Sequence, residues 1–132
     1  MTITETLLSK AVEARQNAYA PYSNFKVGAA ILTNKGNIYV GANAENVSYP
    51  CGTCAEAGAI AAMVAKGERL ISDIVVVAEA KNLITPCGAC LQRILEFSDD
   101  KTTIHLADLQ GIKKSYNIKE LLPVAFKEDL KK

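Results

Sequence analysis

Two short segments hold all four cysteines of the chain and constrain its fold more than any other feature. Residues 51–56 read Cys-Gly-Thr-Cys-Ala-Glu, and residues 86–90 read Pro-Cys-Gly-Ala-Cys. Each segment opens an apolar stretch with helical spacing, and a Cys-x-x-Cys pair can supply two thiolates of a tetrahedral zinc site. Because no secretory signal is visible, metal ligation is favoured over disulfide pairing.

The composition limits the class of protein. The chain has 132 residues, of which 49% are hydrophobic and 22% are charged, and its net charge is +1. These values are typical of a globular protein, so we expect a single domain over residues 1–132. There is no basic surface for a nucleic-acid backbone, and no apolar run reaches the roughly 18 residues that span a bilayer. We therefore expect a cytoplasmic protein that binds neither nucleic acid nor membrane.

Local patterns predict helices that alternate with strands. Apolar spacing indicates the helices, β-branched runs indicate the strands, and turn residues at 34–37 indicate a hairpin. This order predicts an α/β fold, a three-layer α/β/α sandwich around a mixed five-stranded sheet. Thr4 is the expected N-cap of the first helix. The expected helices are 4–20, 54–66, 87–97 and 118–122; the expected strands are 27–33, 38–42, 72–78, 102–107 and 113–116; a C-terminal segment follows at 123–130.

The cysteines allow three interpretations. A structural zinc site in a non-catalytic module would use all four of them. A catalytic zinc site would use Cys54, Cys87 and Cys90 and would leave the fourth position to water. A redox dithiol would need only one pair, so two pairs make it the weakest interpretation. The only histidine, His105, lies inside an expected strand, and we expect a satisfied sheet residue there rather than a ligand.

Glu56 bears on the choice between a structural and a catalytic zinc. It lies two residues after Cys54, in the first turn of an apolar helix. A glutamate there could simply complement the helix dipole. Zinc lowers the pKa of bound water to about 7, and a nearby carboxylate can then act as general acid and base. A structural site has no need of this carboxylate, so Glu56 favours catalysis.

Three further segments carry polar and aromatic residues in a distinctive order. These segments are 22–30, 41–49 and 120–126. Together with 54–56 and 86–90 they resemble the cytidine deaminases, in particular the small homotetrameric type with a zinc ion held by cysteines. The resemblance implies one Zn²⁺ per chain on Cys54, Cys87 and Cys90. It also implies that Glu56 carries a proton from the attacking water to N3 of the pyrimidine and then to the departing ammonia. Cys51 falls where the family has no ligand, and we expect a small apolar wall residue there.

The resemblance also implies a fold, a substrate and an assembly. The fold is the cytidine deaminase-like sandwich, and the activity is hydrolytic deamination of cytidine and deoxycytidine to uridine and deoxyuridine in pyrimidine salvage. Phe25 would stack on the base, and Asn43 and Glu45 would bind the ribose 3′-hydroxyl. Backbone groups at Ala55 would contact the pyrimidine edge, and Phe126 would reach a neighbouring subunit's site in a homotetramer. From the residues alone, the same side chains could be turn residues and core anchors.

The chain departs from the family's pattern beside the cysteines. The family usually has Arg-Thr after Cys-Ala-Glu and Arg after the second cysteine pair, whereas Ala57, Gly58 and Leu91 stand here. Those arginines offset thiolate charge, so the metal would be a weaker Lewis acid unless another cation compensates. Arg93, one helical turn after Cys90, is the candidate. The departures also leave room for another aminated heterocycle as substrate, such as a modified cytosine nucleoside or a blasticidin-like compound.

Overall fold

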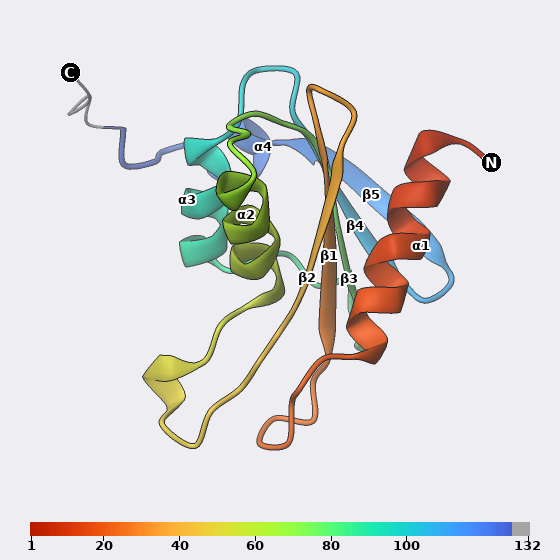
Figure 1. Ribbon diagram of the computed structural model, residues 1–132, viewed down its shortest axis with the longest axis vertical. Helices are drawn as coiled ribbons and strands as arrows, with labels where there is room; N and C mark the ends of the chain where they lie inside the picture. Colours follow the sequence, from red (N-terminus) through yellow and green to blue (C-terminus); the bar gives the residue numbers. More distant parts are fainter. Residues whose placement is uncertain (128–132) are drawn as a thin grey trace.

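The computed structural model describes residues 1–127. It contains a five-stranded sheet with helices on both faces (Figure 1). The part of the expected C-terminal segment beyond residue 127 lies outside the described residues. Within residues 1–127, no helix combines the length and the apolar content needed to cross a bilayer. The helices are α1 (Ile3–Gln16), α2 (Ala55–Ala65), α3 (Gly88–Glu96) and α4 (Ile118–Leu121), with a 3-10 helix η1 (Tyr49–Cys51). The strands are β1 (Val27–Thr33), β2 (Ile38–Ala42), β3 (Ile71–Ala78), β4 (Thr103–Asp108) and β5 (Gly111–Asn117).

The sheet is mixed, with the strand order β2-β1-β3-β4-β5. Only β3 and β4 pair in parallel, and α3 makes the crossover between them, as a parallel pair requires. The other neighbouring strands pair antiparallel. Helix α1 covers one face of the sheet, and α2 and α3 cover the other (Figure 1). The predicted three-layer sandwich is therefore confirmed.

The central strand β3 separates two apolar clusters. Ile74 and Val76 belong to the cluster beneath α2 and α3, whereas Val75 and Val77 belong to the cluster beneath α1. Successive side chains of a strand point to opposite faces, so a continuous apolar run fills both clusters. The larger cluster, beneath α2 and α3, fixes the two helices that carry the cysteines.

The first helix and the last strand differ from the sequence prediction. Thr2, not Thr4, caps α1, because its hydroxyl accepts a bond from the Glu5 backbone N–H at 3.1 Å. The helix ends at Gln16 rather than at residue 20, since Tyr19 leaves it to exchange backbone hydrogen bonds with the segment after β2. Strand β5 is longer than predicted at both ends, because its pairing with β4 outweighs the weak strand propensity of its lysines.

A glycine on β2 lets the metal-site helix approach the sheet. A Cβ atom on Gly41 would lie 2.2 Å from the carbonyl oxygen of Ala55 and 2.5 Å from the backbone nitrogen of Ala59. Both contacts are with the backbone of α2, which cannot move aside as a flexible side chain can. The N-terminus of α2 can therefore lie this close to β2 only because residue 41 is a glycine, which has no side chain.

We expect Gly41→Ala to lower the free energy of unfolding by about 1–3 kcal/mol or more, because the added methyl overpacks the contact between β2 and α2. Gly58→Ala is the matched control, since a Cβ there would meet only the Gly41 Cα atom at 3.7 Å. An alanine inside a helix should raise stability by about 0.5–1 kcal/mol. Urea denaturation of both variants tests this. Equal stability of Gly41→Ala and the unchanged protein would show that α2 does not need this close approach.

Candidate active site

The predicted site residues gather where two helices begin. Cys54 is the N-cap of α2 and Cys87 is the N-cap of α3, while Glu56 and Cys90 lie in the first turns of these helices. The free N–H groups and the dipole of a helix N-terminus stabilise a thiolate. The fold thus places cysteines beside the free N–H groups at the N-termini of two helices.

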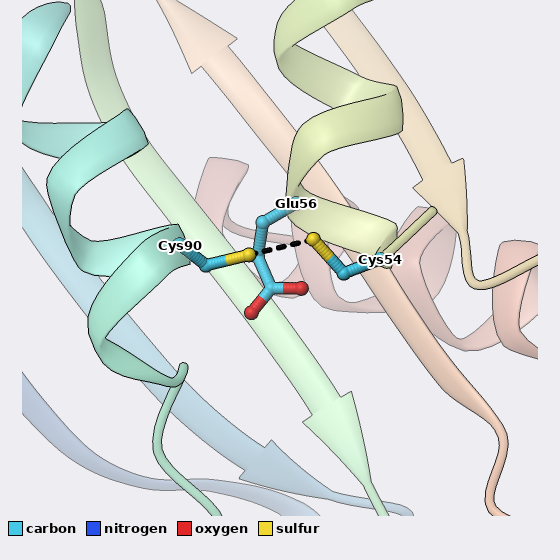
Figure 2. A group of neighbouring side chains, drawn as sticks. All are labelled: Cys54, Glu56 and Cys90. Atoms are coloured by element: carbon cyan, nitrogen blue, oxygen red, sulfur yellow. Dashed lines mark hydrogen bonds between the residues drawn. The ribbon is translucent and has the colours of Figure 1, made fainter. Parts of the chain in front are cut away.

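Cys54, Glu56 and Cys90 form one compact group, with a sulfur or carboxylate oxygen from each within 4.8 Å of the others. The two sulfurs come from different helices and lie 2.6 Å apart, so that one thiol donates a hydrogen bond to the other. Figure 2 shows the Glu56 carboxylate directed toward these sulfurs. Glu56 and Cys90 are buried and Cys54 is partly buried.

The two thiols share their protons unequally. The hydrogen bond from Cys90 lowers the pKa of Cys54 to about 6. The same bond, together with burial, raises the pKa of Cys90. Cys54 is therefore the first thiolate of the pair at neutral pH, and a thiolate is the form that binds a metal ion.

Glu56 has the acidity that proton transfer near neutral pH requires. Only 5% of the residue is exposed, and this burial raises the pKa of the carboxyl group to about 7. The negative charge of Cys54 raises the pKa further, and the positive charge of Arg93 opposes both effects. A carboxyl group with this pKa can both hold and release a proton near pH 7.

Arg93 lies beside both sulfurs, as hypothesised from its spacing. Its Nη1 atom donates to Cys90 Sγ at 3.4 Å and to Cys54 Sγ at 3.7 Å. Both thiols raise the pKa of the guanidinium, and Cys87 adds a smaller effect of the same sign. The positive charge is therefore near all three cysteines that the family resemblance assigns to zinc.

The other two cysteines lie outside the compact group. Cys87 is exposed at the start of α3, three residues before Cys90. Cys51 is exposed in η1, where its thiol donates to the Ser48 hydroxyl at 3.5 Å. The expectation of an apolar wall position for Cys51 is wrong, because η1 leaves this side chain exposed.

The residues of the compact group fit a zinc ion. Zinc in proteins prefers thiolate sulfur, and a site of this kind needs thiols that ionise without a large cost. Cys54 meets this need through its pKa of about 6, and Cys90 places a second sulfur next to it. Glu56 adds a buried carboxyl group at the same point.

Glu45 organises the loop that follows α1. One carboxylate oxygen accepts hydrogen bonds from the backbone N–H groups of Tyr22 and Ser23, both at 3.0 Å. The other oxygen accepts a bond from the Ser23 hydroxyl. These bonds, the hydroxyl bond foremost, lower the pKa of Glu45. In this structure the carboxylate therefore serves the loop, and part of its accepting capacity remains for a ligand.

Asn43 holds the next part of the same loop. Its amide oxygen accepts from the Val27 N–H at 2.8 Å, and its amide nitrogen donates to the Phe25 carbonyl at 2.8 Å. Both bonds fix the backbone on either side of Lys26, so Asn43 sets the position of Phe25. Asn43 and Glu45 therefore make the loop contacts expected of turn residues, and these contacts are compatible with an additional role in ligand binding.

A cavity of about 350 Å³ adjoins this loop, lined by Tyr22, Ser23, Glu45, Asn46, Tyr49 and Gly52. Tyr22 and Tyr49 meet edge to face there, with ring centroids 6.1 Å apart. Sequence reasoning missed this pair, although both tyrosines lie in segments that it singled out. Glu45 connects the cavity to the predicted ribose contacts, whereas the compact cysteine group does not line it.

The remaining predicted residues lie at different depths. Ala55 is fully buried as the first residue of α2, next to Cys54. Phe126 is 69% exposed, and its carbonyl oxygen accepts a bond from the Gln92 side chain of α3 at 3.0 Å. Phe25 is partly buried in the loop before β1.

His105 is a satisfied sheet residue, as predicted. One ring nitrogen lies 2.7 Å from the Ser115 hydroxyl, and the other lies 2.8 Å from the Asp73 carboxylate. The imidazole is nearly buried on β4, with both nitrogens occupied. It therefore takes no part in the compact group.

Thiols and a carboxyl group that meet at two helix N-termini of an α/β/α sandwich define a metal-binding protein, with the metal site at the start of α2 and α3. Residues 1–106 match the family described as "Cytidine and deoxycytidylate deaminase zinc-binding region", and the chain belongs to this family. That description confirms the zinc predicted from the cysteine pairs.

Similar proteins agree with this assignment. The chain is 43% identical to a cytidine deaminase of Halalkalibacterium halodurans, with 92% of each chain covered. It is 42% identical to a cytidine deaminase of Sporosarcina psychrophila, over 96% of this chain and 93% of the relative. The crystal structure of cytidine deaminase from Burkholderia pseudomallei superposes with a TM-score of 0.88 at 43% identity, covering 96% of this chain and all of that one. This likeness confirms the predicted fold class.

Proposed function

We propose that the protein is a zinc-dependent hydrolase that converts cytidine and deoxycytidine to uridine and deoxyuridine, with release of ammonia. The observation that carries this proposal is the buried Glu56, whose pKa of about 7 suits proton transfer, within 4.8 Å of two thiol sulfurs. A purely structural zinc site has no use for such a carboxyl group. The relatives named above are cytidine deaminases, which supports the same substrate.

Zinc would be held by Cys54, Cys90 and Cys87, one ion per chain. Cys87 is included because it occupies the same N-cap position on α3 that Cys54 occupies on α2. Its influence on Arg93, which contacts the other two sulfurs, supports this choice. When bound, zinc supplies a Lewis acid that lowers the pKa of water toward neutrality.

Glu56 moves the protons of the reaction. It accepts a proton from the water that attacks C4 of the pyrimidine and delivers it to ring nitrogen N3. It then passes the second water proton to the amino group, so that the C4–N bond breaks and ammonia leaves. A carboxyl group with a pKa of about 7 suits both directions of transfer at neutral pH. The balance is cytidine plus water to uridine plus ammonia.

The nucleoside would lie along the loop that Glu45 and Asn43 organise. Phe25 stacks on the base, while the unused accepting capacity of Glu45 and the second amide N–H of Asn43 bind the ribose 3′-hydroxyl. The backbone of Ala55, in the first turn of α2 where N–H groups lack helical partners, contacts the pyrimidine edge. The neighbouring 350 Å³ cavity is within the size range of small-molecule sites.

The substrate class is tested by offering the zinc-loaded protein a panel of cytidine, deoxycytidine, cytosine, a modified cytosine nucleoside and a blasticidin-like compound. We expect turnover of the first two and none of free cytosine, because the ribose contacts are then lost. Turnover of only the last two compounds would favour the related aminohydrolase. Turnover of none, with zinc present, would favour a non-catalytic zinc module.

We also infer that the chain assembles as a homotetramer with sites at subunit interfaces. The support is the presence of exposed apolar side chains, with Val124 91%, Tyr49 76% and Phe126 69% exposed. Exposed apolar groups of this kind are typical of an interaction surface. Free thiols that must stay reduced to bind zinc favour the cytoplasm as the compartment, where pyrimidine salvage would use the product.

We expect Phe126→Ala to weaken assembly and activity together, because Phe126 would complete a neighbouring subunit's site. Sedimentation velocity and initial rates on the same samples would measure both properties. Leu109→Ala, which removes an exposed apolar side chain between β4 and β5, is the control and should change neither. A Phe126→Ala protein that stays tetrameric and fully active would exclude this role.

A further inference from the structure

We propose that Arg93 is the positioning cation of the thiolate site and that zinc affinity in this protein depends on its charge. This inference rests on the zinc site proposed above and concerns a residue of the chain that the family description does not assign. The observation behind it is the pair of hydrogen bonds from one guanidinium nitrogen to the sulfurs of Cys90 and Cys54.

The charge of the site requires a cation. Three thiolates outweigh the two positive charges of a zinc ion, and the buried Glu56 carboxylate adds another negative charge when it ionises. The N-termini of α2 and α3 offset part of this excess, with a partial charge of about +0.5 each. A full positive charge beside the sulfurs offsets more of the negative charge, and the Arg93 guanidinium supplies this charge.

The sulfurs are the main polar partners of Arg93. Within residues 1–127, ion pairs join His105 to Asp73 and Lys119 to Asp100, and neither of these pairs involves Arg93. Arg93 lies on the exposed side of α3 and reaches back over one turn to Cys90. Solvent weakens its field on that side, but the direct N–H···S contacts do not depend on long-range attraction.

The packing explains why the cation is at position 93. Leu91 is 7% exposed and belongs to the apolar cluster beneath α2 and α3, so an arginine there would place a charge in the core. Ala57 is only half-buried and lies one turn after Cys54, the same spacing that joins Arg93 to Cys90. Position 57 could thus hold a cation, but in this chain it does not.

The test measures zinc affinity by competition with a chelator of known affinity. We expect Arg93→Ala to weaken zinc binding about 10–100-fold, as loss of a group that contacts metal ligands typically does. Arg93→Lys should retain part of the affinity, because it keeps the charge without the planar fork. Arg69→Ala is the matched control, since the hydrogen bonds that Arg69 donates within residues 1–127 go to the backbone carbonyls of Val64 and Glu68. It should bind zinc as the unchanged protein does.

The decisive variant moves the charge. Adding Ala57→Arg to Arg93→Ala should restore zinc affinity, because the new guanidinium is one turn from Cys54. The thermal midpoint of the metal-free Arg93→Ala protein should equal that of Arg69→Ala, whereas a merely structural role would lower it. Equal zinc affinity of Arg93→Ala and Arg69→Ala, or no restoration in the double variant, would overturn the inference. Absence of zinc from the unchanged protein would instead overturn the proposed site.

Discussion

Glu56→Gln should lose deaminase activity by about 10²–10⁴-fold while it keeps its zinc and its fold. Glutamine has nearly the same shape, so it preserves the packing around a residue that is only 5% exposed. An amide cannot accept a proton from water and return it to the pyrimidine ring. Because burial already raises the pKa of Glu56 to about 7, the uncharged replacement should cost little stability.

The measurement is the initial rate of uridine formation, together with the zinc content of the same preparation. Glu68→Gln is the control, since Glu68 is equally buried but accepts its bonds from Asn37 and Tyr39, away from the cysteines. It should leave the rate per folded molecule unchanged. If Glu56→Gln turned over cytidine at the normal rate, Glu56 would be only a helix-dipole partner of α2.

Replacing either Cys54 or Cys90 should remove the metal, whereas replacing Cys51 should not. Cys90→Ala deletes a sulfur that lies 2.6 Å from Cys54 Sγ and that Arg93 contacts. With one thiol gone, the remaining groups no longer form the thiolate set that zinc prefers. We expect Cys90→Ala to bind well under one zinc per chain and to have no measurable activity.

Cys51→Ala is the matched control, because Cys51 is exposed in η1 and its thiol donates to the Ser48 hydroxyl. It should keep one zinc per chain and most of the activity. Cys87→Ala tests whether Cys87 is the third zinc ligand, and we expect this variant to lose zinc as Cys90→Ala does. Zinc loss in Cys51→Ala would instead favour a structural four-cysteine site.

The fold could be predicted largely from local patterns. The hairpin strands β1 and β2 begin and end where the β-branched runs and the turn at 34–37 predicted, because sequence and pairing agree there. The cap of α1 could not be predicted, since Thr2, Thr4 and Thr6 offer the same hydroxyl near the helix start. Strand β5 carries lysines that suit an exposed edge, so its length emerged only from its register with β4.

The sequence predicted which residues lie at the site, but it predicted fewer of the contacts between them. Spacing brought Cys54, Glu56 and Cys90 to two helix N-termini, and one helical turn brought Arg93 to the sulfurs. Sequence spacing does not reveal that the Glu45 carboxylate is occupied by its own loop, because those partners lie more than twenty residues away. The aromatic pair of the cavity was missed for the same reason.

The most direct test of the account is a single reaction of the zinc-loaded protein with cytidine in isotopically labelled water. We expect uridine and ammonia in equal amounts, with one labelled oxygen at C4 of each uridine, and no reaction after zinc is removed by a chelator. Re-addition of zinc should restore the rate. A protein that holds one zinc per chain but forms no uridine, or that forms it equally well without zinc, would contradict the proposed function.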